Sequence, residues 1–232
     1  MERPFRQFEP REVSAATASA ETAEIPFHCQ TVNEAFERAL RGDGVGIVYP
    51  LGIDLATCQH MHDQAIGEFL EGTAQQQEAN SIKYLLGLNP EIFEPLYSKC
   101  LVDNDALSKP VVAANVMYMM YPPGAALASH YDFVNGEMSG PDYSVEENLT
   151  IIYILAGTKR LSVFSEGAPS QTAGPQTHEV TQRADMLIVL RGGTFMDGAQ
   201  VRHAVCHGVP ELRKDEIASS VTFDLMPLRE EG

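Results

Sequence analysis

A histidine and an aspartate separated by one residue, His130 and Asp132, are the strongest chemical signal in this sequence. Residues i and i+2 of an extended strand point to the same face, so both side chains can reach one ion. Two imidazoles and one carboxylate on one face of a ferrous ion leave three positions open for a bidentate co-substrate and dioxygen. The pair therefore predicts a non-haem iron site that needs a second histidine from elsewhere in the chain.

We expect this second histidine to be His203, in the segment VRHAVCHG at positions 201–208. A late strand is predicted there, and closure of a β-sandwich would bring that strand beside the one carrying His130. His207 in the same segment is the alternative ligand. An isolated HxD pair is often only a surface pair or a packed histidine, so the assignment depends on the surrounding elements.

Other clusters of potential ligands are weaker. Cys58, His60 and His62 lie close together in the sequence, but residues i and i+2 of a helix do not face each other. We interpret them as solvated or partly packed side chains. The methionines within 117–120 are expected in the core or in the lining of a pocket.

The elements that must position these residues change in type along the chain. Periodicity and stop signals predict helices at Thr31–Arg41, Asp54–Leu70 and Asn89–Leu107, with a strand at Gly44–Tyr49. The second half contains short β-branched or apolar runs separated by Gly, Pro, Asn and Asp. These predicted strands are Val111–Tyr121, Leu149–Leu155, Arg160–Phe164, Met186–Leu190, Val201–Cys206 and Ser219–Met226. Strands that follow helices without βαβ alternation favour an α+β fold with a jelly-roll core and flanking N-terminal helices.

Composition limits the possible partners and compartments. The 232 residues carry a formal net charge of −16, which disfavours binding to a nucleic-acid backbone. Residues 1–25 lack apolar periodicity and are expected to form a disordered tail before a single domain at 26–232. Four scattered cysteines and the absence of a bilayer-length apolar run favour a cytoplasmic protein without membrane contact. The sequence leaves the oligomeric state open.

With these motifs in place, the sequence resembles the Fe(II)/2-oxoglutarate-dependent dioxygenase superfamily between about Ala35 and Met226. The segment from Tyr121 to Asp132, YPPGAALASHYD, matches the YxPGxxLxxHxD pattern of the alkylation-repair demethylase branch. The run of His203, Ala204 and Cys206 is similar to the HAxC of prolyl-4-hydroxylase-like members. The resemblance implies a double-stranded β-helix, Fe(II) at His130, Asp132 and His203, 2-oxoglutarate as co-substrate and O2.

The resemblance also implies residues that bind 2-oxoglutarate. Tyr121 corresponds to a tyrosine that donates a hydrogen bond to the co-substrate, and Arg213 stands ten positions after His203, where a basic residue binds the distal carboxylate. A guanidinium suits this task because it presents a planar fork to a carboxylate. Arg202, Arg191 or Lys214 are the alternatives, and Ser220 or Thr222 the expected hydroxyl partner.

Two departures from the demethylase pattern affect the expected substrate. Ala218 and Asp224 stand where that branch has arginines, which argues against nucleic acid. We expect oxidation of an unactivated C–H bond, by hydroxylation, desaturation or cyclisation, in a small molecule such as an amino acid derivative or secondary metabolite. The segment Phe133–Val145 is a candidate lid over the site. The alternatives are an oxidase of the isopenicillin-N-synthase kind, a nucleic-acid demethylase and a non-catalytic jelly-roll binding module.

Overall fold

The computed structural model describes residues 25–101, 106–107, 111–132, 148–164, 176–193, 195–197 and 200–227. The candidate lid, Phe133–Val145, and nearly all of the predicted tail at residues 1–25 lie outside these ranges. The tail, the lid and the single-domain organisation therefore stay predictions.

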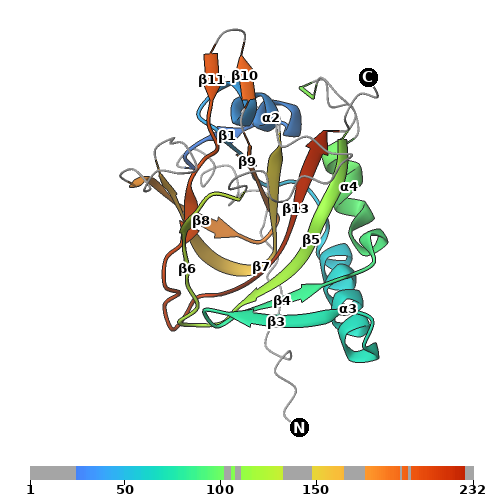
Figure 1. Ribbon diagram of the computed structural model, residues 1–232. Coiled ribbons are helices and arrows are strands. Elements are labelled where there is room, and N and C mark those ends of the chain that lie inside the picture. Colours follow the sequence, from blue (N-terminus) through green and yellow to red (C-terminus); the bar gives the residue numbers. More distant parts are fainter. Residues whose placement is uncertain are drawn as a thin grey trace.

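Most strands belong to one curled sheet of 11 strands, with a separate hairpin beside it (Figure 1). Its main path runs β1-β2-β9-β7-β13-β5-β4-β3, while β8 pairs with β7, and β12 pairs with both β7 and β6. The strands are β1 His28–Cys29, β2 Val45–Val48, β3 Gln75–Ala79, β4 Ile82–Leu86, β5 Val111–Tyr121, β6 Leu127–His130, β7 Leu149–Phe164, β8 Gln176–Arg183, β9 Met186–Arg191, β12 His207–Val209 and β13 Ile217–Pro227. The hairpin pairs β10 (Phe195–Asp197) with β11 (Gln200–Arg202).

The long strand β7 connects the two halves of this curled sheet. Its first half pairs with β13 and β9, and its second half pairs with β8 and β12. Between them lies Gly157, whose φ of +76° and close approach to the backbone of Ile217 leave no room for a Cβ atom. The sheet bends there and folds over itself, as expected for a double-stranded β-helix.

In the described part of the chain, three α-helices pack on the outside of the sheet, and their ends follow ordinary capping rules. Helix α2 (Val32–Arg41) begins where the Thr31 side chain accepts a hydrogen bond from the Glu34 N–H. Helix α3 (Leu55–Glu71) is capped in the same way by Asp54 and ends at Gly72 in the left-handed conformation. A short 3₁₀ turn, η2 (Pro90–Phe93), leads into α4 (Glu94–Leu101).

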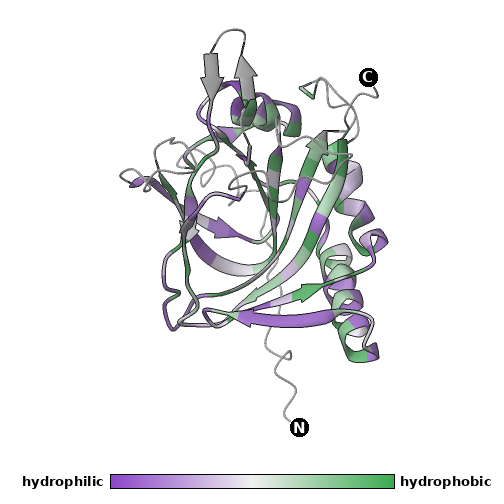
Figure 2. Cartoon of the chain, in the orientation of Figure 1, coloured by the Kyte–Doolittle hydropathy of each residue, from purple (hydrophilic) through white to green (hydrophobic). Residues whose placement is uncertain are grey.

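Side-chain alternation along the sheet separates a helix-facing surface from an inner surface. Tyr118, Val221 and Phe223 face the helices and join the main apolar cluster. Met119 and Tyr121 on β5 point the other way, into the curl of the sheet. Figure 2 shows apolar colouring along the central strands and a hydrophilic β3, whose residues are all exposed. The inner surface is therefore where functional side chains can collect.

None of the described helices is long and apolar enough to cross a lipid bilayer.

Candidate active site

Three potential metal ligands meet on the inner surface, where β6 ends and β12 begins. His130 is the last residue of β6, Asp132 lies two residues further along the chain, and His207 opens β12. Antiparallel pairing sets His207 directly opposite His130, which brings the two imidazoles to a centroid separation of 4.5 Å. The Nε2 atoms of His130 and His207 lie 3.4 and 3.5 Å from Asp132 Oδ1. Within the described residues, one potential ligand atom from each of the three lies within 4.8 Å of the others.

Backbone carbonyl groups orient both imidazoles toward this common point. Nδ1 of His130 lies 2.9 Å from the Ala128 carbonyl oxygen, and Nδ1 of His207 lies 3.3 Å from that of Val205. A carbonyl only accepts, so in each ring Nδ1 carries the proton and donates it. In the neutral imidazole, each Nε2 then keeps a free lone pair, which is the usual arrangement for a metal-bound histidine.

The electrostatics of the three groups also suit a cation. Burial alone would raise the pKa of Asp132, but the nearby His207 and His130 lower it to about 2. Burial lowers the pKa of His207. For His130, burial is outweighed by the hydrogen bond and charge of Asp132, and the pKa rises. Among the described residues, the buried Asp132 Oδ2 has no hydrogen-bond partner, a costly state that a bound cation would relieve. The residues present therefore fit a divalent metal with two nitrogen ligands and one oxygen ligand.

The structure brings His207 to this site in place of the expected His203. His203 lies in the irregular segment between β11 and β12, four residues before the strand that pairs with β6. His203 therefore lies outside the strand that is paired with β6, and it is not among the residues whose potential ligand atoms meet. The similarity of His203, Ala204 and Cys206 to an HAxC run favoured His203, whereas the pairing register places His207 opposite His130.

His203 instead contributes its backbone to a clamp formed by Arg191, which is fully buried. The guanidinium donates from Nε to the His203 carbonyl oxygen at 2.6 Å, and from Nη1 to the carbonyl oxygens of Ala39 and Leu40 at 3.0 and 2.9 Å. The Arg191 carbonyl oxygen accepts the Val205 N–H. Arg191 thus ties the segment leading to His207 to the end of helix α2. Arg191 was an alternative anchor for the co-substrate, but it does not line the cavity that extends from the three potential ligands.

A cavity of about 170 Å³, the inner cavity, extends from the three ligands into the curl of the sheet. Its lining consists of Tyr84, Met117, Met119, Tyr121, Leu127, His130, Asp132, Thr150, Ile152, Lys159, Leu161, His207, Val209 and Thr222. Lys159 is the only lysine or arginine among the described residues that line the inner cavity. It is 1% exposed, and burial lowers the pKa of its ammonium group to about 7.

Lys159 has only weak partners for a buried cation. Its Nζ lies 3.6 Å from the centre of the Tyr121 ring and 3.5 Å from Ser220 Oγ. No ion pair joins it to an acidic side chain of the described residues. A buried ammonium group without a carboxylate is costly, so an anionic ligand is its expected partner.

The other residues expected to bind 2-oxoglutarate are divided between the cavity and the surface. Tyr121 and Thr222 line the inner cavity, and Ser220 contacts Lys159. Arg213 is exposed in the turn between β12 and β13, where its backbone N–H donates to Glu216. Lys214 is exposed in the same turn, and the Arg202 side chain lies outside the described part of the chain. Sequence analysis missed Lys159, although a lysine between the apolar stretches of one strand was the available signal.

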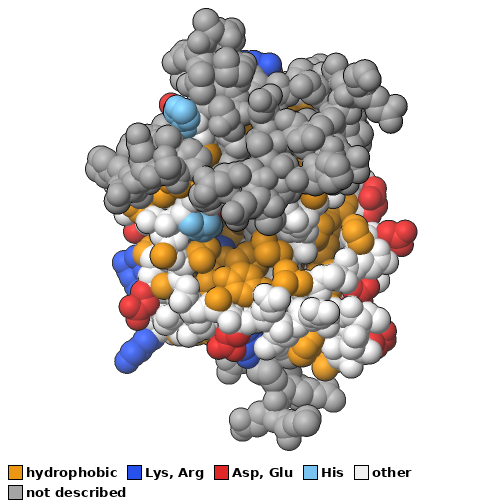
Figure 3. Space-filling view, in the orientation of Figure 1, with side chains coloured by type: hydrophobic (Ala, Val, Ile, Leu, Met, Phe, Trp, Pro, Cys, Tyr) orange, Lys and Arg blue, Asp and Glu red, His pale blue; other side chains and the backbone are white. Residues whose placement is uncertain are grey.

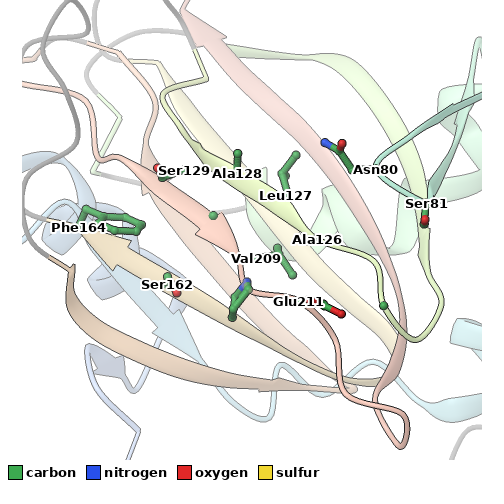
Figure 4. Close-up of a pocket in the computed structure, with 13 residues that line it drawn as sticks. Asn80, Ser81, Ala126, Leu127, Ala128, Ser129, Ser162, Phe164, Val209 and Glu211 are labelled. Atoms are coloured by element: carbon green, nitrogen blue, oxygen red, sulfur yellow. The ribbon is translucent and has the colours of Figure 1, made fainter.

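Two further hollows border this region. The side cavity, about 550 Å³, is lined by Leu86, Gly87, Leu88, Pro90, Ala113, Ala114, Asn115, Val116, Met117, Asp132, Thr150, Thr222 and Asp224. Figure 4 shows the other, a hollow of about 560 Å³ along β6, β12 and the end of β7. Ser162 and Phe164 of this hollow alternate along β7 with Lys159 and Leu161, so it lies on the opposite face of that strand. It does not reach the three ligands. In Figure 3, hydrophobic side chains gather in the middle of the visible face, beneath a histidine.

The sequence matches no model of a known protein family and no curated protein. The fold, however, is similar to solved structures. The α-ketoglutarate-dependent carbocyclase SnoK from nogalamycin biosynthesis has a TM-score of 0.61 and 12% identity, covering 85% of this chain and 86% of that one. A Pseudomonas putida prolyl-4-hydroxylase has a TM-score of 0.55 and 15% identity, covering 86% and 100%.

HygX from Streptomyces hygroscopicus, solved with nickel and 2-oxoglutarate bound, has a TM-score of 0.53 and 12% identity over 80% of this chain and 83% of that one. The printed name of each of these proteins, or the ligand bound to it, refers to 2-oxoglutarate (α-ketoglutarate) or to hydroxylation. At these identities the similarity concerns the fold. Over most of its length, the chain has the double-stranded β-helix fold of the Fe(II)/2-oxoglutarate-dependent oxygenases.

Proposed function

We propose that this protein is an Fe(II)/2-oxoglutarate-dependent oxygenase that oxidises a C–H bond of a small molecule. The observation that carries the proposal is the inner cavity, with three metal-ligand side chains at one end and the buried ammonium group of Lys159 among its walls. A dicarboxylate with an α-keto group fits such a space, because one end can chelate a metal while the other meets a cation.

In this proposal His130, Asp132 and His207 hold the ferrous ion through two Nε2 atoms and a carboxylate oxygen. Bound iron, with 2-oxoglutarate and O2, supplies the oxidising chemistry: substrate, 2-oxoglutarate and O2 yield hydroxylated substrate, succinate and CO2. The Ala128 and Val205 carbonyl groups keep the imidazole protons on Nδ1. This fixes both rings in the orientation that binding requires.

Lys159 replaces Arg213 as the proposed anchor for the distal carboxylate of 2-oxoglutarate. Its proton stays on Nζ once the carboxylate binds, because the new charge pair offsets the burial that lowers its pKa. Tyr121 packs its ring against the ammonium group, and Ser220 and Thr222 offer hydroxyl groups nearby. The apolar side chains of Leu161 and Val209 keep this end of the cavity dry.

A small-molecule substrate is supported by charge and by the similar structures. With a net charge of −16, the protein would not gain the electrostatic attraction to phosphate groups that supports nucleic-acid binding. SnoK comes from nogalamycin biosynthesis, and HygX has also been solved with hygromycin B bound. Asp224, in the place of a demethylase arginine, adds an acidic group instead of a cation close to the site.

The test is anaerobic reconstitution with Fe(II) and 2-oxoglutarate, followed by addition of O2 and a metabolite library. We expect a visible charge-transfer band before O2 and substrate-stimulated succinate afterwards. Product formation with O2 consumption but without succinate would favour an oxidase of the isopenicillin-N-synthase kind. Absence of both the band and any turnover would favour a non-catalytic binding module. Coupled turnover of methylated oligonucleotides alone would contradict the small-molecule assignment.

A further inference from the structure

The side cavity adjoins the proposed iron site and has the properties of a substrate pocket. It shares four lining residues with the inner cavity, Met117, Asp132, Thr150 and Thr222, so the two spaces meet beside the metal ligand Asp132. Its volume of about 550 Å³ lies within the range of small-molecule sites. A molecule in this cavity would therefore lie next to the metal without displacing a ligand from the inner cavity.

One wall of the side cavity is polar, centred on Asp224. This residue extends the inward-facing series Ser220 and Thr222 along β13, and its side chain is largely buried. Asp224 Oδ2 accepts a hydrogen bond from the Asn115 amide at 2.8 Å, and Oδ1 accepts one from the Thr150 hydroxyl at 3.1 Å. A carboxylate has about four acceptor positions, so these two bonds leave capacity for a ligand donor.

A β-bulge brings Asn115 to this wall. The register of β13 against β5 shifts between Thr222 and Asp224, and Asn115 adopts a positive φ of 53°. The extra residue in β5 turns the Asn115 amide toward Asp224, which a regular strand would not do. The pairing holds the carboxylate in one position at the edge of the cavity.

The charges in the side cavity determine what it can accept. Asp132 and Asp224 line it, and no lysine or arginine does so among the described residues. Leu86, Leu88 and Val116 supply an apolar wall. A carboxylate or phosphate here would meet two acidic groups without a compensating cation. Lys159, in contrast, lines only the inner cavity, so the two spaces have opposite electrostatic preferences.

We propose that the side cavity binds the prime substrate, an apolar molecule that donates a hydrogen bond to Asp224 through a hydroxyl or amino group. This inference rests on the proposed oxygenase function for the identity of the neighbouring metal. The Asp224 contact fixes one end of the molecule, and the apolar wall holds its body beside Asp132. The donor group is the recognition element, and the C–H bond that reacts lies on the part of the molecule nearest the metal.

Three probes of similar skeleton test the preference: phenethyl alcohol, phenethylamine and phenylacetate. Each is titrated anaerobically into the protein loaded with Fe(II) and 2-oxoglutarate, with calorimetry for affinity and the visible band for proximity to iron. We expect the alcohol or the amine to bind at least about tenfold more tightly than phenylacetate, and to perturb the band. A preference for the amine indicates an ionised Asp224, and a preference for the alcohol indicates a protonated one; both support the proposal.

Two substitutions separate recognition from folding. Asp224→Leu removes the acceptor and should abolish the preference for the donor probes, and Asp224→Asn should weaken the amine about tenfold. The matched control is Asp185→Asn, because Asp185 accepts hydrogen bonds from Gly52 and Ile53 and lines neither cavity. It should leave the order of the three probes unchanged, and urea denaturation of each variant measures the folding cost independently.

Equal or tighter binding of phenylacetate, no measurable binding of any probe, or an unchanged preference in Asp224→Leu would overturn the inference. These results are distinguishable from failure of the proposed function. If 2-oxoglutarate gives no band but calorimetry retains the Asp224-dependent preference, the side cavity stands and the oxygenase proposal falls. If the band forms without any donor preference, only the assignment of the side cavity falls.

Discussion

The two histidines of VRHAVCHG differ in their surroundings, and this difference predicts their roles. His207 pairs with His130 and directs Nε2 at Asp132, whereas His203 precedes the strand and offers its carbonyl group to Arg191. We expect His207→Ala to weaken Fe(II) binding by at least about 100-fold, since loss of a ligand should exceed the effect of losing its supporting hydrogen bond. Anaerobic titration with Fe(II) measures this effect.

His203→Ala is the matched control for this measurement. It keeps the backbone carbonyl that Arg191 binds, so Fe(II) affinity should stay close to that of the wild type. Loss of iron binding in His203→Ala with retention in His207→Ala would restore the ligand set expected from the sequence.

Lys159 is expected to dominate 2-oxoglutarate affinity. Lys159→Met keeps much of the buried volume but leaves the distal carboxylate without a cation, which should cost on the order of 2–5 kcal/mol of binding free energy. The charge-transfer band of the anaerobic iron complex gives the dissociation constant. Arg213→Ala serves as the control and should bind like the wild type, because Arg213 is exposed. The reverse result for the two variants would return the anchor to Arg213.

At the scale of elements, the Arg191 clamp joins α2, β9 and the segment before β12. Arg191→Leu would leave the carbonyl groups of Ala39, Leu40 and His203 without their donor. Each buried acceptor that loses its partner costs about 1–3 kcal/mol, so with three such acceptors the free energy of unfolding should fall by at least roughly 3 kcal/mol. Urea denaturation measures this loss. Fe(II) affinity should fall as well, since the segment that carries His207 loses its attachment to the helix.

A control for the clamp is Arg41→Leu, which removes an exposed salt bridge to Glu37 on helix α2. Partly exposed ion pairs contribute little, so this change should cost about 1 kcal/mol or less. Equal losses in the two variants would show that the carbonyl contacts of Arg191 contribute nothing specific.

Elements with strong local signals could be predicted from the sequence. The expected helix at Thr31–Arg41 and strand at Val111–Tyr121 are confirmed as Val32–Arg41 and Val111–Tyr121, and Asp54 caps α3 as expected. Capping residues and long apolar runs act locally, so they can be read without knowledge of the fold.

Elements that depend on tertiary pairing could not be predicted. Strand β3 consists of the polar run QQQEA and forms only because β4 pairs with it, and β12 has three residues. The expected strand Val201–Cys206 is wrong in its bounds, because β11 ends at Arg202 and β12 starts at His207. His203 therefore falls between these two strands, and His207 takes the position opposite His130.

The candidate site also contains residues that a local motif could predict and residues that depend on tertiary pairing. His130 and Asp132 belong to one short motif, and their separation by one residue is enough to predict that both bind one metal ion. Lys159 and His207 join them only through the curl of β7 and the pairing of β12, which are long-range features. Asp224 was recognised in the sequence only as a departure from the demethylase pattern. Its cavity and its partners follow from the bulge in β5.

At the scale of the whole molecule, the two buried groups that we assign to ligands make folding depend on pH. Burial lowers the pKa of Lys159 to about 7 and raises that of Asp224 to about 7. Both groups therefore oppose the folded state most strongly near neutral pH when no ligand is bound. Ligands that pair with them should relieve this cost and stabilise the fold by mass action.

The predicted pH dependence has opposite signs for the two groups. Between about pH 7 and 10.5, unfolded Lys159 binds a proton that the folded state lacks, so its contribution to stability rises with pH. Between pH 3.8 and about 7, folded Asp224 holds a proton that the unfolded state has lost, so its contribution falls as pH rises. Relative to the wild type, Lys159→Met should therefore be most stabilised at pH 7 and below, and Asp224→Asn should gain on the wild type from pH 3.8 to about 7. Urea denaturation of the metal-free protein across these ranges gives the two difference curves. Subtracting the wild-type curve removes the titration of groups that do not interact with the substituted side chain; His207, whose pKa the Lys159 charge lowers, and Asp132, which interacts with Asp224, still contribute to the difference curves. Flat difference curves would show that Lys159 and Asp224 titrate normally in the folded protein, and that neither is held in an unfavourable state for a ligand to relieve.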